Sequence, residues 1–157
     1  MLFGIALGSN LGDRAANIQR GIALLVVVPG IELKASSPIY ETEPVNCAPG
    51  TQAFLNSVIE IEAACTPHEL HRHLKAIESA LGRPEKRERN SPRTLDLDLL
   101  YADDVICSDP ELILPHPRMH LRSFVLRPLA DIRPNLILPG FSKAVSEMLQ
   151  EDHNLEL

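Results

Sequence analysis

The sequence predicts an α/β (α+β) fold, with a ferredoxin-like β-α-β-β-α-β core inside a three-layer α/β/α sandwich. Strand-like apolar runs and two stretches of helical periodicity follow one another in that order. A length of 157 residues suffices for one domain with its own core, so residues 1–157 are expected to form a single domain. The chain from Leu112 onward adds an amphipathic segment over residues 124–132 and a short terminal helix, which can cover the second face of the sheet.

The first strand and the first helix are expected before Pro29. Leu2 to Gly8 is a continuous apolar run, typical of a buried strand, and a turn follows it. Asp13 is in position to cap the next helix, because a carboxylate accepts hydrogen bonds from the free amides of a first turn. Apolar residues then recur at helical spacing until Pro29 and Gly30 end the pattern.

A second strand, a loop and a third strand follow. Residues 31–40 are expected to be extended, whereas the prolines and glycine between Glu43 and Gln52 indicate a loop. Residues 54–62 alternate in polarity, as a half-buried strand does. Phe54 and Asn56 therefore share one face of the third strand.

The second helix and the fourth strand complete the expected core. Thr66-Pro67 opens the helix, because proline is favoured at the first helical position, and Gly82 ends it after an apolar stripe. A charged loop over residues 83–92 leads into the stretch from Arg93 to Leu100. Apolar and polar residues alternate in this stretch, which predicts a strand.

The fourth strand carries two carboxylates on one face. Residues i and i+2 of a strand point the same way, so Asp96 and Asp98 project together while Leu95, Leu97 and Leu99 project into the core. Neighbouring carboxylates repel each other unless a cation compensates them. Mg²⁺ takes one or two carboxylates and fills its other positions with water and phosphate oxygens, so the pair predicts a magnesium site. A solvated strand face is the alternative, and the apolar strand argues against it.

The loop before this strand supplies cations. Lys86 and Arg87 are interpreted as solvated residues, whereas Arg93 lies three positions before Asp96 and is expected to contact phosphate. Carboxylates that hold Mg²⁺ beside arginines that hold phosphate are the parts that phosphoryl transfer requires.

The strand order brings the polar residues together. In this topology the third and fourth strands both flank the first strand and run antiparallel to it. Asn56 and Asp96 are therefore expected to converge on Gly8, at the end of the first strand. Phe54, Asn56, Asp96 and Asp98 are expected on the sheet face away from the two helices. Phe54 can stack on a planar ligand there, and Asn56 can hydrogen-bond to it.

The composition bears on which partners the chain can bind and on the cellular compartment in which it works. Lys and Arg number 15 and Asp and Glu number 21, and the net charge of −6 argues against a general nucleic-acid binder. The three cysteines, Cys47, Cys65 and Cys107, fit neither a disulfide framework nor a zinc site, and they favour a reducing cytoplasm. No signal peptide and no membrane span are expected.

Histidines occur in two settings. His68, His71 and His73 lie on the second helix, where no cysteine or carboxylate cluster is expected to complete a metal shell, so an exposed polar face is predicted. His116 is different, because two prolines flank it and Arg122 follows. A rigid turn that presents a neutral imidazole and an arginine suits a nucleotide phosphate.

Several common nucleotide and catalytic motifs are absent from the sequence. The Gly8-Ser9-Asn10 turn lacks the G-x-x-x-x-G-K-[ST] pattern, which excludes a Walker-type kinase. The sequence also lacks G-x-G-x-x-G, G-x-S-x-G and a convincing cysteine nucleophile.

A series of motifs runs in order through most of the chain. They are Gly8-Ser9-Asn10, Tyr40-x-Thr42, Phe54-Leu55-Asn56, Glu78 with Gly82-Arg83, Pro92-Arg93-Thr94-Leu95-Asp96-Leu97-Asp98, Pro115-His116-Pro117-Arg118-Met119 and Arg122-x-Phe124. Taken together they resemble the 6-hydroxymethyl-7,8-dihydropterin pyrophosphokinase family of folate biosynthesis. The resemblance implies transfer of pyrophosphate from ATP to the pterin hydroxymethyl group, with release of AMP. Small-molecule substrates, a cytoplasmic location and a monomer are expected, although the sequence itself does not reveal the oligomeric state.

The resemblance also implies roles for individual residues. Asp96 and Asp98 would hold two Mg²⁺ ions, and Arg83 and Arg93 would serve catalysis by reaching the phosphates. The residues that would bind ATP are Glu78, Arg89, Arg93, His116 and Arg122. The residues that would form the pterin pocket are Thr42, Pro44, Val45, Phe54, Asn56 and Phe124. No strong general base is apparent on the expected face, so catalysis would rest on positioning and charge neutralisation.

The sequence departs from the family at Asn90, where many members have tryptophan, and at Glu85. These departures leave one alternative, a non-catalytic nucleotide- or pterin-binding module of the same fold. The other alternative is a Mg²⁺-dependent transferase that uses D-x-D to hold a nucleotide sugar. That enzyme would need a larger donor-binding domain than this length permits.

Overall fold

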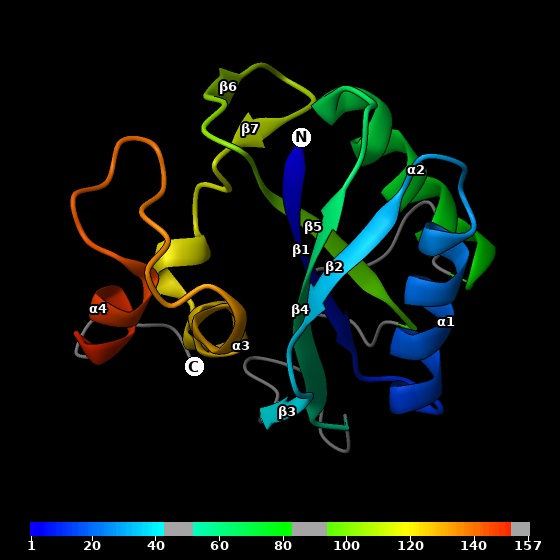
Figure 1. Cartoon of the computed structure of the whole chain (residues 1–157). Helices are drawn as coiled ribbons and strands as arrows, with labels where there is room; N and C mark the ends of the chain where they lie inside the picture. The colour runs from blue at the N-terminus through cyan, green and yellow to red at the C-terminus, as the bar shows by residue number, and fades with distance from the viewer. Residues whose placement is uncertain (43–51, 83–93, 152–157) are drawn as a thin grey trace.

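The computed structural model describes residues 1–42, 52–82 and 94–151, and its elements follow the expected order (Figure 1). The strands are β1 (Leu2–Ser9), β2 (Glu32–Ser36), β3 (Tyr40–Thr42), β4 (Phe54–Glu62), β5 (Asp96–Ala102), β6 (Cys107–Ser108) and β7 (Ile113–Leu114). The helices are α1 (Arg14–Val26), α2 (Pro67–Ala80), the 3₁₀ turn η1 (Met119–Leu121), α3 (Ser123–Ile132) and α4 (Val145–Gln150).

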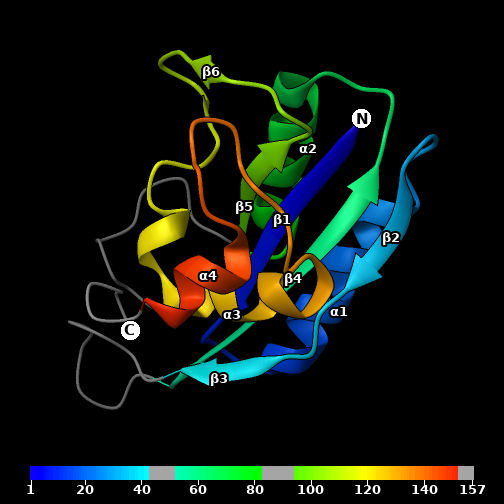
Figure 2. The same ribbon diagram turned by 60° about the vertical axis from the view of Figure 1, so that its left-hand side comes forward.

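The main sheet has the order β2-β4-β1-β5, and β3 pairs with β4 beside β2. Both β4 and β5 run antiparallel to β1 and flank it, as the topology predicts. Strands β6 and β7 form a separate small hairpin, which lies at the opposite end of the sheet from β3 (Figure 2). The ferredoxin-like core is therefore confirmed.

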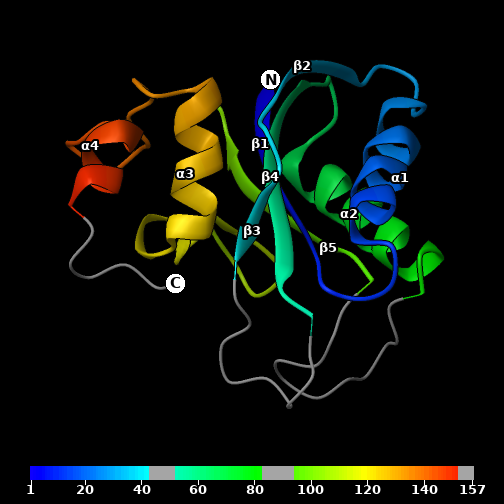
Figure 3. The same ribbon diagram turned by 90° about the horizontal axis from the view of Figure 1, so that it is seen from below.

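Helices cover both faces of the sheet, which confirms the three-layer sandwich. Figure 3 shows α1 and α2 on one side of the sheet, with α3 and α4 on the other. The first side is filled by a buried apolar cluster that includes Ile5, Leu74 and Leu97. The second side is filled by a cluster around Val58 and Leu126. Burial of these side chains on both sides is the main stabilising contribution to the fold.

The helix starts follow the expected capping chemistry. The Asp13 carboxylate accepts a hydrogen bond from the Ala16 amide at 3.1 Å, before the first turn of α1. Thr66 and Glu69 form a reciprocal capping box at α2, with bonds of 3.0 and 3.1 Å. The two caps orient the helices that pack on the first face. Every helix in the described ranges is too short or too polar to cross a bilayer.

The predicted second strand is divided in two. The structure has β2 ending at Ser36 and β3 beginning at Tyr40, because Pro38 cannot donate a ladder hydrogen bond. Ser37 compensates by pairing with the opposite strand through both its amide and its hydroxyl: its amide donates to the Val58 carbonyl and its Oγ accepts from the Val58 amide, each at 2.9 Å. After this interruption β3 pairs with the first residues of β4, where the candidate site lies.

The alternation along β5 also breaks once. The β1–β5 register shifts between Gly4 and Ile5, so both Leu100 and Tyr101 pack in the cluster under α3 and α4. Gly4 permits this arrangement because a Cβ there would lie 2.1 Å from Cε2 of Tyr101. The strand begins at Asp96, and the part of the predicted strand at Arg93 lies outside the described residues.

Candidate active site

Three strands meet at Gly8 near the end of β1. Gly8 is opposite Asn56 of β4 and opposite Asp96 of β5 in the two antiparallel ladders. A Cβ on Gly8 would lie 3.1 Å from Asn56 Oδ1 and 3.7 Å from Phe54 Cδ1. The absence of a side chain at Gly8 therefore leaves room for the Asn56 and Phe54 side chains on this face of the sheet. The predicted convergence of Asn56 and Asp96 on Gly8 is confirmed.

A small polar group forms where β3 joins β4. The Asn56 side chain is 7% exposed, and its Nδ2 donates to Thr42 Oγ1 at 2.8 Å. Phe54 is paired with Thr42 across the two strands. An amide, a hydroxyl and an aromatic ring are thus brought together, and such a set can bind the edge and the face of a planar heterocycle.

The two carboxylates of β5 have the expected orientation. Asp96 and Asp98 are half-buried, whereas Leu97 and Leu99 are buried in the cluster under α1 and α2. Because the two aspartates alternate with these leucines, they face the opposite side of the sheet. Oxygen ligands from one or two carboxylates, with open positions beside them, suit Mg²⁺.

Glu78 of α2 holds the start of β5 in place. Its side chain is buried, and Oε2 accepts a hydrogen bond of 2.7 Å from the Leu97 amide. Its other oxygen forms an ion pair of 3.2 Å with Lys75. The hydrogen bond from the Leu97 amide fixes the residue that lies between Asp96 and Asp98. Helix α2 therefore helps to set the position of the carboxylate pair. The prediction that Glu78 also binds ATP stays a prediction.

A Glu78→Ala variant is expected to lose about 1–3 kcal/mol in free energy of unfolding, because the Leu97 amide loses its buried acceptor. Urea denaturation without nucleotide measures this change. Glu78→Gln keeps an acceptor oxygen and serves as the matched control, with a clearly smaller expected loss. Equal stability of Glu78→Ala and the wild type would contradict the positioning role.

His116 is anchored beside β5, and one of its two ring nitrogens accepts a backbone hydrogen bond. Its backbone amide donates to the Leu100 carbonyl at 2.8 Å, and its Nδ1 accepts from the Arg118 amide at 3.1 Å. Burial lowers the pKa of His116, with Arg122 and Arg118 acting in the same direction and Asp98 opposing them. The neutral ring therefore carries its proton on Nε2, which can donate to an anionic oxygen.

Arg122 and Phe124 stand at the start of α3. The Arg122 guanidinium carbon is 5.5 Å from the centre of the Phe124 ring, within the range of a cation–π contact. Helix α3 packs on β3 and β4, the strands that carry Thr42 and Asn56. The charge of Arg122 also acts on His116. The structure thus places His116 and Arg122, a candidate phosphate-binding pair, on the side of the sheet where Thr42, Phe54 and Asn56 lie.

Comparison with known proteins identifies the family. The model of the 7,8-dihydro-6-hydroxymethylpterin-pyrophosphokinase family matches residues 4–134. The chain belongs to this family. Two curated bacterial relatives carry the name 2-amino-4-hydroxy-6-hydroxymethyldihydropteridine pyrophosphokinase. The protein from Methylorubrum extorquens is 40% identical over 136 residues, which cover 87% of this chain and 85% of that protein. The protein from Bacillus subtilis is 44% identical over 128 residues, covering 82% and 75%.

Other relatives carry the pyrophosphokinase region within longer chains. The folate synthesis bifunctional protein of Arabidopsis thaliana is 45% identical over 129 residues, which cover 82% of this chain and 26% of that protein. A solved HPPK-DHPS in complex with substrates gives a TM-score of 0.73 at 14% identity, covering 96% of this chain and 43% of that chain. At that identity, and over less than half of the solved chain, the likeness shows the fold alone.

Five predicted pyrophosphokinase residues lie outside the described residues. They are Pro44, Val45, Arg83, Arg89 and Arg93. Their roles in pterin binding, ATP binding and catalysis stay predictions. The described ranges bring together Thr42, Phe54 and Asn56 on one side, and His116, Arg122 and Phe124 on the other.

Sequence reasoning missed two features of this pyrophosphokinase fold. Asn17 of α1 holds the turn after β1, because its Nδ2 donates to Ser9 Oγ at 3.3 Å and to the Leu11 carbonyl at 2.9 Å. The expectation that no cysteine or carboxylate accompanies the histidines of α2 was wrong. Asp109, 41 positions further along the chain, and Cys107 lie against His68, and no local pattern in the sequence signals this contact.

Proposed function

We propose that the chain transfers the pyrophosphoryl group of ATP to the hydroxymethyl group of 6-hydroxymethyl-7,8-dihydropterin and releases AMP. Membership of the pyrophosphokinase family and identities of 40% and 44% to named pyrophosphokinases support this activity in folate biosynthesis. The convergence of Asp96 and Asn56 on Gly8 carries the proposal, because it places a carboxylate pair beside side chains that suit a planar heterocycle. The family match does not favour the non-catalytic module.

The carboxylate pair suits the metal that this reaction needs. Asp96 and Asp98 offer hard oxygen ligands on half-buried side chains, and two Mg²⁺ ions would share them along the triphosphate. When bound, Mg²⁺ neutralises the charge of the phosphate oxygens. His116 would donate its Nε2 proton to a phosphate oxygen, and the Arg122 guanidinium would bind phosphate beside it. Arg83, Arg89 and Arg93 are proposed to add further positive charge.

The pterin would lie in the group formed by Thr42, Phe54 and Asn56. The Asn56 amide and the Thr42 hydroxyl would read the polar edge of the ring, and Phe54 and Phe124 would contact its faces. The pterin hydroxyl oxygen then attacks the β-phosphorus of ATP, its proton passes to water, and the bond from that phosphorus to the α,β-bridging oxygen breaks. AMP leaves with the bridging oxygen. Positioning and charge neutralisation provide the acceleration.

Purified protein with ATP, Mg²⁺ and 6-hydroxymethyl-7,8-dihydropterin is expected to release AMP only when the pterin is present. Chromatography of the nucleotides measures AMP and ADP separately. ADP in place of AMP would indicate transfer of a single phosphoryl group, and pterin binding without AMP would indicate the non-catalytic module. Light scattering on the same sample tests the proposed monomer.

A further inference from the structure

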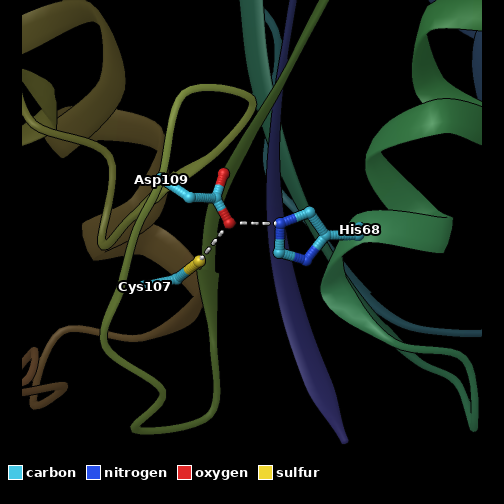
Figure 4. A group of neighbouring side chains, drawn as sticks. All are labelled: His68, Cys107 and Asp109. Atoms are coloured by element: carbon cyan, nitrogen blue, oxygen red, sulfur yellow. Dashed lines mark hydrogen bonds and ion pairs between the residues drawn. The ribbon is translucent and has the colours of Figure 1, made fainter.

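Three side chains from two elements meet away from the carboxylate pair. His68 lies in the first turn of α2, and Cys107 and Asp109 belong to the β6–β7 hairpin (Figure 4). His68 Nε2 is 2.6 Å from Asp109 Oδ2, and Cys107 Sγ is 3.5 Å from the same oxygen. One atom from each side chain lies within 4.8 Å of the others. Cys107 and Asp109 follow the end of β5, whereas Asp96 begins that strand.

The Asp109 carboxylate is held so that one oxygen faces the group. Its Oδ1 accepts hydrogen bonds from the backbone amides of Glu111 at 3.0 Å and Leu112 at 2.9 Å. Its Oδ2 is directed at His68 and Cys107. Metal-binding carboxylates are often oriented in this way by hydrogen bonds to the second oxygen. The hairpin turn therefore prepares Asp109 to act as a one-oxygen ligand.

The histidine is also well positioned. The capping box of Thr66 and Glu69 fixes the turn of α2 that carries His68. The side chains of His68 and Asp109 are 33% and 38% exposed, so an ion and a water molecule can reach them. The sulfur–oxygen separation already fits a tetrahedral zinc site, whose ligand atoms lie about 3.3–3.6 Å apart. The nitrogen–oxygen pair has to open by less than about 1 Å, which a half-exposed histidine can accommodate.

We propose that His68, Cys107 and Asp109 bind one Zn²⁺ ion, with water in the fourth position. Imidazole and thiolate are ligands that Zn²⁺ accepts and that Mg²⁺ does not use, so this donor set separates the two metals. Nearby Glu111 is engaged by Arg72 through two hydrogen bonds of 3.0 and 3.1 Å, so it is not assigned as a ligand.

A metal at this point would join the start of α2 to the β6–β7 hairpin. The hairpin ends at Leu114, and His116 follows two residues later. Zn²⁺ would therefore restrain the segment that presents His116. Since the ion binds only the folded arrangement of these three side chains, it would also raise the stability of the protein.

Titration of the full chain with Zn²⁺ against a chelating dye, at saturating Mg²⁺, tests the proposal. The wild type is expected to take up one Zn²⁺ per chain, and His68→Gln, Cys107→Ser and Asp109→Asn are expected to weaken uptake by about 100-fold or more. Zn²⁺ should also raise the Tm of the wild type and leave that of Cys107→Ser unchanged. Co²⁺ in place of Zn²⁺ should show thiolate charge-transfer absorption only when Cys107 is present.

Matched variants separate this site from general metal uptake. Cys65→Ser removes another thiol near α2, His73→Gln removes another histidine of the same helix, and Cys47→Ser removes the remaining thiol. All three are expected to bind Zn²⁺ as the wild type does. Failure of the wild type to take up Zn²⁺ would overturn the proposal, as would undiminished binding by Cys107→Ser or His68→Gln. Zn²⁺ uptake is measured without substrate, so its result does not depend on whether the chain has pyrophosphokinase activity.

Discussion

Asp96→Ala and Asp98→Ala variants are expected to fold normally and to lose pyrophosphoryl transfer by about 100-fold or more, because each removes a proposed ligand of the metal that offsets developing charge. Both side chains are half-buried and carry like charges on neighbouring positions of one strand face. Removing one of them relieves repulsion, so the fold is expected to survive. AMP release at saturating ATP and pterin, measured over a range of Mg²⁺ concentrations, gives the effect on rate and on metal requirement.

Asp104→Ala is the matched control for these variants. Asp104 is an exposed aspartate just after β5, so its replacement makes the same change in net charge away from the site. Its activity should equal that of the wild type. Unchanged turnover in either Asp96→Ala or Asp98→Ala would contradict the proposal that these two residues bind Mg²⁺. This holds even if the chain is an active pyrophosphokinase.

Gly4→Ala is expected to lower the free energy of unfolding by about 2 kcal/mol or more, because the added methyl group would overlap a buried ring. The new Cβ would lie 2.1 Å from Cε2 and 2.4 Å from Cζ of Tyr101. The ring cannot easily move away. Tyr101 is 2% exposed, and its hydroxyl donates to Glu60 Oε2 at 2.6 Å. Glu60 is held in turn by Arg133 at 2.6 Å. Urea denaturation followed by circular dichroism measures the loss.

A double-mutant cycle shows whether the ring is the cause. In a Tyr101→Leu background the smaller side chain leaves room for the methyl group, so Gly4→Ala should cost clearly less there than in the wild type. An equal cost in both backgrounds would mean that backbone effects at Gly4, and not the Tyr101 ring, determine the loss.

The local pattern of the sequence predicts most of the core and the centre of the site. The alternation of polar and apolar residues along the fourth strand correctly predicts that Asp96 and Leu97 point to opposite faces of the sheet. This prediction succeeds because successive side chains of any strand alternate between its two faces. The β-α-β-β-α-β order then brings Asn56 and Asp96 to Gly8, because topology decides which strands are neighbours.

Features that depend on contacts between distant residues are harder to predict. The register shift that buries both Leu100 and Tyr101 depends on the absence of a side chain at Gly4, which lies on another strand. The contact of His68 with Asp109 joins residues 41 positions apart. Local periodicity carries no information about such pairs, so they emerge only when the hairpin is seen beside the helix.

The bond between Glu78 and the Leu97 amide also bears on self-association. Within residues 1–42, 52–82 and 94–151, β5 is the last strand of the sheet on its side, and an unpaired amide at such an edge invites a strand from another molecule. The Glu78 carboxylate already accepts from that amide, and a charged oxygen binds it more strongly than a neutral carbonyl would. An incoming strand would have to displace a buried carboxylate before it could add to the sheet. The residue that aligns the carboxylate pair is therefore also expected to oppose strand addition at this point of the sheet edge.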